Sequence, residues 1–198
     1  MVDGVTTTKT VSKWTVPTAP VKDGAAFIGW KKGDAIVAAN TSFTVTEDCT
    51  IEALFVEFDA IGVSVKTEGT QGLRFKNQVT AESVALLESL GITASYGTKL
   101  THDTLGTLHI ATKNWIDEAN KLYAAVLTFD GVENVESYYD DVFTATAYVE
   151  IGGVKYYANA TQKASIAYVA GLALEDTSVS YSEAEKSYLQ AIVDSVNA

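Results

Sequence analysis

The sequence predicts an α+β fold, in which a small all-β module precedes an antiparallel-sheet domain with about three helices. The first 58 residues hold short runs rich in Thr and Val, broken by Gly and Pro, and no stretch with a helical period. Residues 143–151 alternate apolar and polar side chains, as a half-buried strand does. Two amphipathic helices close the chain without alternating with strands, which favours α+β over a doubly wound sheet.

The first module, residues 1–58, is expected to contain short strands. They span residues 14–16, 26–30, 36–38, 43–45 and 50–58. Pro17 and Pro20, the only prolines of the chain, bracket the first connection. Only residues 59–60 separate this module from the second domain, residues 61–198. Because two residues are too short a linker for free tumbling, we expect a fixed interface between the two.

The second domain is expected to be an antiparallel sheet with helices. Its strands cover residues 61–65, 72–78, 96–100, 108–111, 122–128, 143–151 and 154–157. The last two strands are joined by Gly152-Gly153, a two-residue hairpin loop of the kind that needs positive φ.

Three helices complete this domain. Thr80 is placed to cap the first helix, and Gly91 is placed to end it in the left-handed conformation. The second helix has apolar side chains at positions 166, 169, 170, 173 and 174. Ser182 and Glu185 have the spacing of a capping box at the start of the third.

Residues 17–55 carry a spaced pattern of glycines and aromatic residues that ends in a Thr-Glu-Asp strand entry. The pattern consists of Gly24, Phe27, Gly29, Trp30, Thr46, Glu47 and Asp48, followed by a closing strand at 50–55. With these residues the segment resembles the internalin-type B repeat, also called the Listeria–Bacteroides repeat. The resemblance implies a small β-grasp-like module of secreted bacterial surface proteins, often found in tandem, that serves as a spacer or an adhesive.

The second half carries a series of short motifs. They are Gln-Gly-Leu-Arg-Phe at 71–75, Tyr-Gly-Thr at 96–98, Ala-Thr-Lys-Asn at 111–114, Phe-Thr-Ala at 143–145 and Ser-Ile-Ala-Tyr-Val-Ala at 165–170. In this order they are similar to an uncharacterised C-terminal domain of secreted gut Firmicutes proteins. The resemblance implies an extracellular or cell-wall-attached location in bacteria, and it implies no particular chemistry.

Composition excludes several classes of partner. The chain has 198 residues, 47% of them hydrophobic, and 14 basic against 25 acidic residues give a net charge of −11. Such a surface repels phosphate backbones and anionic lipids, so we expect neither nucleic acid nor membrane insertion. Cys49 is the only cysteine, which excludes an internal disulfide. A monomer that contacts a glycan or another surface protein is expected.

Phe27 and Trp30 lie three residues apart on a predicted strand. Because three is an odd step, the two side chains are expected on opposite faces, one in the core and one on a second surface or rim. Structural packing is the favoured interpretation, and a glycan platform is the alternative.

Arg74 is the only arginine among the 14 basic residues. Its neighbours Leu73 and Phe75 are expected to face the core, so the guanidinium points the other way. A guanidinium is suited to bidentate contacts with carboxylates or carbonyls. A structural salt bridge is therefore the favoured interpretation, and recognition of an anion or of sugar hydroxyls is the alternative.

Residues 130–141 hold five acidic residues and no basic one. Carboxylate oxygens of such a run could bind calcium, although the spacing is not that of an EF-hand loop. A solvated acidic loop is favoured, and no metal site is predicted.

Aromatic side chains are the other candidates for a ligand site, because the faces of sugars stack on flat rings. The aromatic residues in question are Trp115 and the pairs Tyr138-Tyr139 and Tyr156-Tyr157. Adjacent strand residues face opposite ways, so one platform takes at most one member of each pair. Core or rim packing is the default. The candidate ligand-binding residues are Trp115, Tyr138, Tyr139 and Arg74.

No motif predicts an enzyme, and no cofactor is expected. His102 and His109 are the only histidines, and their spacing is expected to place them on opposite faces of one strand. The chain lacks H-E-x-x-H, G-x-S-x-G, Walker A and G-x-G-x-x-G patterns.

The sequence thus favours a non-catalytic extracellular interaction or spacer module of a bacterial cell-surface or secreted protein. One alternative is a carbohydrate-binding module, which predicts an exposed aromatic patch. A second alternative is an accessory or catalytic domain of a glycan-degrading enzyme, which predicts a cleft with two opposed carboxylates.

Overall fold

A computed structural model describes residues 13–112, 114–130 and 134–198. Residues 1–12, with which the first predicted module begins, and residues 131–133 of the acidic run lie outside the described residues. Over the described ranges the chain forms antiparallel sheets with three α-helices, which confirms the predicted α+β class.

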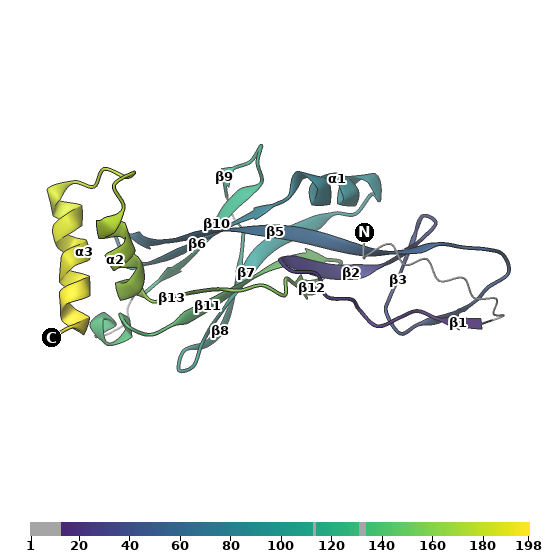
Figure 1. The fold of residues 1–198 in the computed structure, drawn as a ribbon, viewed down its shortest axis with the longest axis horizontal. Helices are drawn as coiled ribbons and strands as arrows, with labels where there is room; N and C mark the ends of the chain where they lie inside the picture. The colour runs from purple at the N-terminus through teal and green to yellow at the C-terminus, as the bar shows by residue number, and fades with distance from the viewer. Residues whose placement is uncertain (1–12, 113, 131–133) are drawn as a thin grey trace.

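The largest sheet has six strands in the order β3-β2-β5-β6-β10-β9 (Figure 1). Its strands are β3 (Ala35–Val37), β2 (Ala25–Lys32), β5 (Ile51–Lys66), β6 (Gly72–Val79), β10 (Leu122–Thr128) and β9 (Trp115–Asp117). All neighbouring strands in it are antiparallel.

A second sheet has five strands, with β12-β11-β7-β8 side by side and β13 pairing with one end of β11. These are β12 (Val154–Tyr157), β11 (Phe143–Ile151), β7 (Ala94–His102), β8 (Gly106–Ala111) and β13 (Gln162–Ala164). A separate two-stranded sheet pairs β1 (Lys13–Thr15) with β4 (Ser42–Thr44).

The first and third helices begin at the caps that the sequence predicted, whereas the cap of the second was not predicted. Thr80 caps α1 (Ala81–Ser89), Ser165 caps α2 (Ile166–Glu175), and Ser182 with Glu185 forms a capping box at α3 (Glu183–Val196). A 3-10 helix, η1, covers Val135–Tyr138. Figure 1 shows α2 and α3 together at one end of the sheets, far from β1. Among the described residues, no helix is long and apolar enough to cross a membrane.

Strand β5 links the two halves of the molecule. Its 16 residues pair with β2 from Ile51 to Glu57 and with β6 from Phe58 to Lys66. Residues 59–60, expected to be a linker, therefore lie inside a strand that both predicted modules share. A β-bulge between Ala60 and Gly62 adjusts the register there without ending the strand.

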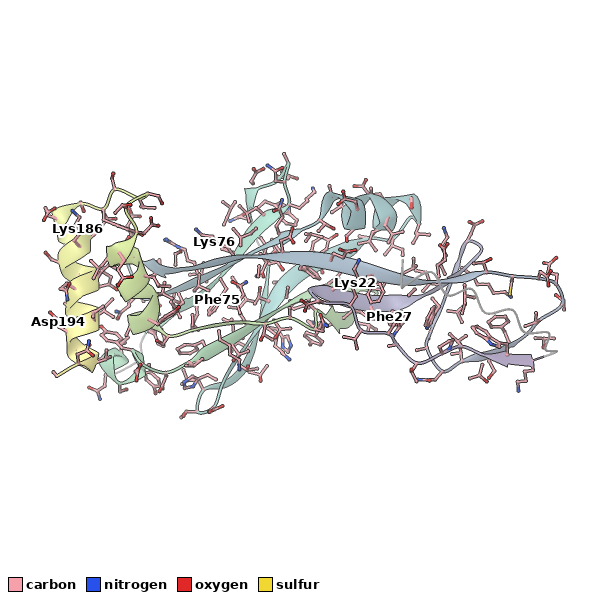
Figure 2. The ribbon with its side chains drawn as sticks, in the orientation of Figure 1. Lys22, Phe27, Phe75, Lys76, Lys186 and Asp194 are labelled. Atoms are coloured by element: carbon pink, nitrogen blue, oxygen red, sulfur yellow. The ribbon has the colours of Figure 1, made fainter. Side chains whose placement is uncertain are left out.

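The hydrophobic core falls into two clusters. One combines Ala26, Ile28, Leu54, Val56 and Phe58 of the first predicted module with Val79, Leu87, Tyr123, Ala147, Val149 and Ala158 of the second. The other packs both sheets against α2 and α3, with Phe75 in its interior (Figure 2). Because the first cluster draws on both modules, separating them would expose buried apolar surface to water.

The motif Phe27-Ile28-Gly29-Trp30 differs from its prediction. Phe27 and Trp30 were expected on opposite faces, and this expectation is wrong, since their ring centroids are 5.6 Å apart in a T-shaped contact. A β-bulge between Phe27 and Gly29 adds one residue to β2. Phe27 and Trp30 therefore lie on the same face of the sheet although they are three residues apart. Gly29 permits the bulge because its φ is +148°. Ile28 and Gly29 are the buried residues of the motif, and both aromatics are half-buried.

Candidate functional site

The five-stranded sheet carries a group of polar and aromatic side chains on the face turned away from the core. In register, Lys99 of β7 pairs with His109 of β8, Tyr148 of β11 with Tyr157 of β12, and Glu150 of β11 with Lys155 of β12. Directly paired residues of antiparallel strands share a face. We call the surface formed by Lys99, His109, Tyr148, Glu150, Lys155 and Tyr157 the Tyr148–Tyr157 face.

The rings and cations of this face contact one another. His109 Nε2 lies 2.9 Å from the Tyr157 hydroxyl, and the rings of Tyr148 and Tyr157 meet edge to face with centroids 6.0 Å apart. Lys99 Nζ lies 4.8 Å from the centroid of Tyr157, and Lys155 Nζ lies 5.5 Å from that of Tyr148. Such cation–π pairs fix the lysines beside the rings.

Tyr148 forms the buried floor of the face, and Tyr157 forms its exposed part. Tyr148 is 2% exposed, whereas Tyr157 is 38% exposed. The floor depends on Gly97 of β7, which pairs with Tyr148. A Cβ atom at Gly97 would overlap the phenol of Tyr148 and would come within 2.5 Å of the carbonyl oxygen of Ile110. Only glycine leaves room for the ring at this position.

Burial and charge set the protonation of this face. Burial raises the pKa of the Tyr148 phenol, and the nearby Lys155 partly opposes that rise. The pKa of Lys155 is raised chiefly by its hydrogen bond to Glu150, with Nζ and Oε2 2.9 Å apart. The raised pKa values keep the Tyr148 phenol and the Lys155 ammonium group protonated, so both are hydrogen-bond donors.

Trp115, a predicted site residue, lies elsewhere. It pairs with Tyr123 on the core side of the six-stranded sheet, and its ring contacts those of Tyr123 and Tyr96 with centroids 5.8 Å away in each case. Lys121 Nζ sits 5.3 Å from its centroid. Trp115 is half-buried at the rim of the core rather than displayed as a flat platform.

Tyr138 and Tyr139 lie in and just after η1, beside the second core cluster. Tyr139 is 8% exposed, and its hydroxyl lies 2.9 Å from Gln71 Nε2. Tyr138 stacks on Phe129 with centroids 6.0 Å apart. Trp115 packs against the other core cluster, so the structure does not bring it together with this pair.

Arg74 is half-buried on β6, between Ser64 of β5 and Val126 of β10. The salt bridges of the described ranges do not include it, so the favoured structural salt bridge is not found within these ranges. The reason lies in the register, which places Arg74 opposite a serine and a valine rather than an acidic residue. Recognition of an anion by Arg74 stays a prediction.

The pair Tyr156-Tyr157 behaves as strand residues should. Tyr156 packs against the core and Tyr157 joins the outer face. Lys99, His109 and Lys155 were missed as its neighbours. Counting back from the two-residue loop Gly152-Gly153 gives the Tyr148–Tyr157 pair, a signal that was available in the sequence.

The histidines occupy separate strands, which corrects their expected placement on one strand. His102 ends β7, with a side chain 6% exposed, and His109 lies on β8. The amide groups of Thr104 and Leu105 donate to His102 Nδ1. Nε2 therefore carries the proton and donates to Asp141 Oδ2, 3.1 Å away, which holds the ring in one tautomer.

The described part of the acidic run offers no cluster of metal ligands. Asp141 binds His102, and Asp140 is exposed to solvent. Nowhere in residues 13–112, 114–130 and 134–198 do three or more His, Cys, Asp or Glu side chains come together as metal ligands would. Residues 131–133, which belong to the predicted calcium alternative, lie outside these ranges.

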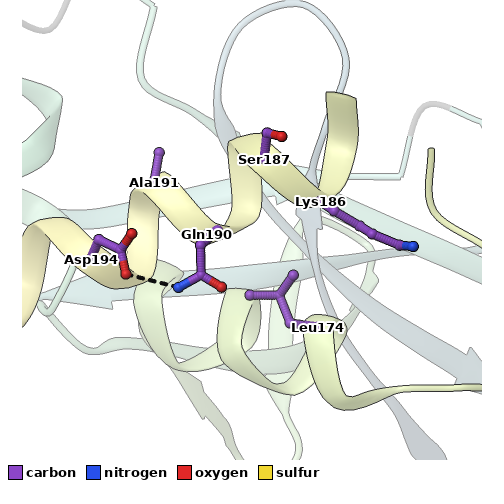
Figure 3. Close-up of a pocket in the computed structure, with 6 residues that line it drawn as sticks. All are labelled: Leu174, Lys186, Ser187, Gln190, Ala191 and Asp194. Carbon is purple, nitrogen blue, oxygen red and sulfur yellow. Dashed lines mark hydrogen bonds between the residues drawn. The ribbon is translucent and has the colours of Figure 1, made fainter. Parts of the chain in front are cut away.

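A shallow groove of about 490 Å³ runs along α3 (Figure 3). It is lined by Leu174 of α2 and by Lys186, Ser187, Gln190, Ala191 and Asp194 of α3. Gln190 Nε2 donates to Asp194 Oδ1 at 2.8 Å, so two of its polar groups already satisfy each other. The Tyr148–Tyr157 face is the stronger candidate because Lys99, His109 and Tyr148 all contact one exposed side chain, Tyr157.

Comparisons with known proteins give little further guidance. No family model matches the chain, and no curated protein matches it. Among solved structures, it is similar to a DUF3823 family protein from Bacteroides ovatus, with 11% sequence identity and a TM-score of 0.33. That match covers 79% of this chain and 100% of the other.

Proposed function

We propose that this chain is a non-catalytic interaction module of an extracellular or cell-wall-attached bacterial protein, and that it holds its binding surface at a fixed distance from the rest of its protein. The observation that carries the proposal is the continuity of β5. A strand of 16 residues spans roughly 50 Å, and here it pairs with strands of both predicted modules.

Packing supports the same role. The core cluster shared by the two modules leaves no hinge between them, because bending at residues 59–60 would break ladder hydrogen bonds and expose apolar side chains. A binding surface that is already rigid loses less conformational entropy when a partner docks. A rigid module of this kind suits a spacer that presents a ligand surface.

The two halves are expected to unfold in one transition. Trp14 and Trp30 report on the first half and Trp115 on the second. A variant with Trp14→Phe and Trp30→Phe, and another with Trp115→Phe, are unfolded in urea and followed by fluorescence and by far-ultraviolet circular dichroism. Within each variant the two probes should give the same midpoint. Midpoints that differ between the probes would show that the halves unfold independently and would remove the support for a rigid spacer.

Carbohydrate binding is a second candidate function, favoured by the exposed ring of Tyr157 beside hydrogen-bonding groups. The ring is 38% exposed, its hydroxyl contacts His109, and the ammonium group of Lys99 lies over the ring. A sugar can stack on such a ring while its hydroxyls bind the neighbouring donors.

Tyr157→Ala is expected to weaken binding to any retained polysaccharide by at least tenfold, about 1.4 kcal/mol. Affinity gels with plant, host and bacterial polysaccharides provide the measurement. Tyr168→Ala is the matched control, because Tyr168 is 62% exposed on α2 and lies off this face. Equal losses in both variants, or a loss only in Trp115→Ala or Tyr138→Ala, would place the site elsewhere.

A further inference from the structure

We propose that the Tyr148–Tyr157 face binds an anionic carbohydrate, one whose sugar rings carry carboxylate or sulfate groups. The proposal rests on the carbohydrate-binding candidate above and adds the chemical class of the ligand. It follows from the charge of this face, from the position of its uncompensated lysines and from the side chains that surround them.

The face reverses the charge balance of the protein. The whole chain has a net charge of −11, yet the outer side of this sheet carries Lys99, Lys155 and Lys163 against Glu150. Lys163 of β13 pairs with Thr144 of β11, which places it on the same side as Tyr148. A local excess of cations on an acidic protein attracts anions to one place and repels them from the rest.

Lys99 and Lys163 are the cations available to a ligand. Glu150 lies 2.9 Å from Lys155 and compensates it. Over residues 13–112, 114–130 and 134–198, neither Lys99 nor Lys163 has a carboxylate within salt-bridge distance. Lys99 lies over the Tyr157 ring, 4.8 Å from its centroid, so its ammonium group is next to the exposed aromatic surface.

The remaining groups suit a sugar better than an acidic peptide. Besides the exposed Tyr157 ring, the face offers His109 and the hydroxyls of Thr101, Thr107 and Thr144, all from the same side of the sheet. A peptide gains its affinity from a free strand edge or an apolar groove. Here the candidate groups are side chains on one face of a sheet, contributed by all four strands from β12 to β8, and not the backbone groups of a strand edge. An acidic sugar can stack its flat side on the Tyr157 ring and bind the neutral donors through its hydroxyls. Its acid group can pair with the ammonium groups of Lys99 and Lys163.

The test compares oligogalacturonate with the same oligosaccharide after reduction of its carboxyl groups, and adds heparin and poly-glutamate as sulfated and peptide anions. Binding is measured by calorimetry in 150 mM salt (roughly physiological ionic strength) and as the salt concentration rises. The acidic oligosaccharide or heparin should bind at least tenfold more tightly than the neutral oligosaccharide. Lys99→Met should reduce that binding about tenfold and flatten its salt dependence, since one cation is lost.

Lys186→Met is the control, because Lys186 is an exposed lysine of α3, paired with Glu183 and distant from this face (Figure 2). Circular dichroism checks that each variant is folded. Equal binding of the acidic and the neutral oligosaccharide, lost in Tyr157→Ala, would overturn this inference and leave carbohydrate binding standing. Equal effects of Lys99→Met and Lys186→Met, or binding of poly-glutamate as tight as that of the acidic oligosaccharide, would overturn the inference too. Either result would mean that the protein attracts anions by charge alone. Absence of binding to every glycan by the folded protein would refute both ideas.

Discussion

Replacement of Gly97 by alanine is expected to lower the free energy of unfolding by about 3 kcal/mol, in the upper range for overpacking an interior. The added Cβ would overlap the Tyr148 phenol and come within 2.5 Å of the Ile110 carbonyl oxygen. The carbonyl belongs to the backbone of β8 and cannot move aside as a side-chain tip could. Tyr148 must leave its place, and the floor of the Tyr148–Tyr157 face goes with it.

Gly171→Ala is the matched control for this substitution. Gly171 lies inside α2, and a Cβ added there meets no atom within 4 Å. Because alanine favours helix over glycine by about 1 kcal/mol, this variant should be as stable as the parent or more so. Urea unfolding of both variants measures the effect. A Gly97→Ala protein with parental stability would mean that β7 can shift relative to β8, and Tyr148 can leave its place, without cost.

Because of Tyr123, the free energy of unfolding is expected to fall above about pH 10. Its side chain is 1% exposed, and its hydroxyl donates to the Gly97 carbonyl oxygen at 2.9 Å, which joins β10 of one sheet to β7 of the other. Burial raises the pKa of this phenol far above its ordinary value. In the unfolded chain a tyrosine loses its proton near pH 10. Stability is therefore full below pH 10 and falls as pH rises toward the folded-state pKa.

Tyr123→Phe is expected to flatten that decline. At pH 7 the variant should lose about 1 to 2 kcal/mol, because the hydrogen bond to Gly97 is removed. Between about pH 10 and pH 12 its stability should fall less steeply than that of the parent. Burial also raises the pKa of Tyr96, Tyr148 and Tyr188, so both proteins keep part of the slope.

The measurement is urea unfolding at half-unit steps of pH (roughly from 9 to 12, around the tyrosine pKa). Tyr168→Phe serves as the control, because Tyr168 is 62% exposed and its loss should leave the curve unchanged. Parallel curves for the parent and Tyr123→Phe would assign the alkaline loss to other groups.

Local signals in the sequence were sufficient to predict the elements whose ends are fixed by neighbouring residues. Ser182 and Glu185 form the capping box that their spacing predicted. Gly152 and Gly153 have φ of +58° and +81°, as their hairpin required. Each of these features depends on contacts within a few residues, which is the range over which a single sequence carries clear information.

Features that depend on distant partners were not predicted. The bulge at Phe27 and Gly29 depends on how β2 pairs with β5, and it reversed the expected direction of one aromatic side chain. The uninterrupted course of β5 through residues 59–60 follows from pairing with β6, although those residues read as a linker. In both cases tertiary pairing decided between conformations that the local sequence left open.

In the candidate site, too, the sequence predicted a single residue but not the distant residues that contact it. Tyr157 was named among the aromatic candidates, while its contacts come from Lys99 and His109, 58 and 48 positions away in the chain. Arg74 drew attention as the only arginine, yet rarity says nothing about its neighbours, and Ser64 and Val126 proved to be the residues beside it. Charge on a sheet face becomes visible only once the register of its strands is known.

The unbroken course of β5 also determines how the molecule would carry a mechanical load. Hydrogen bonds of antiparallel strands lie perpendicular to the strand direction. A pull along β5 would therefore strain its bonds to β2 and β6 together, in shear, rather than one after another. The bonds would share the tension between the two ends of the molecule, and the surface of the second sheet would keep its position while the protein that bears it is under strain.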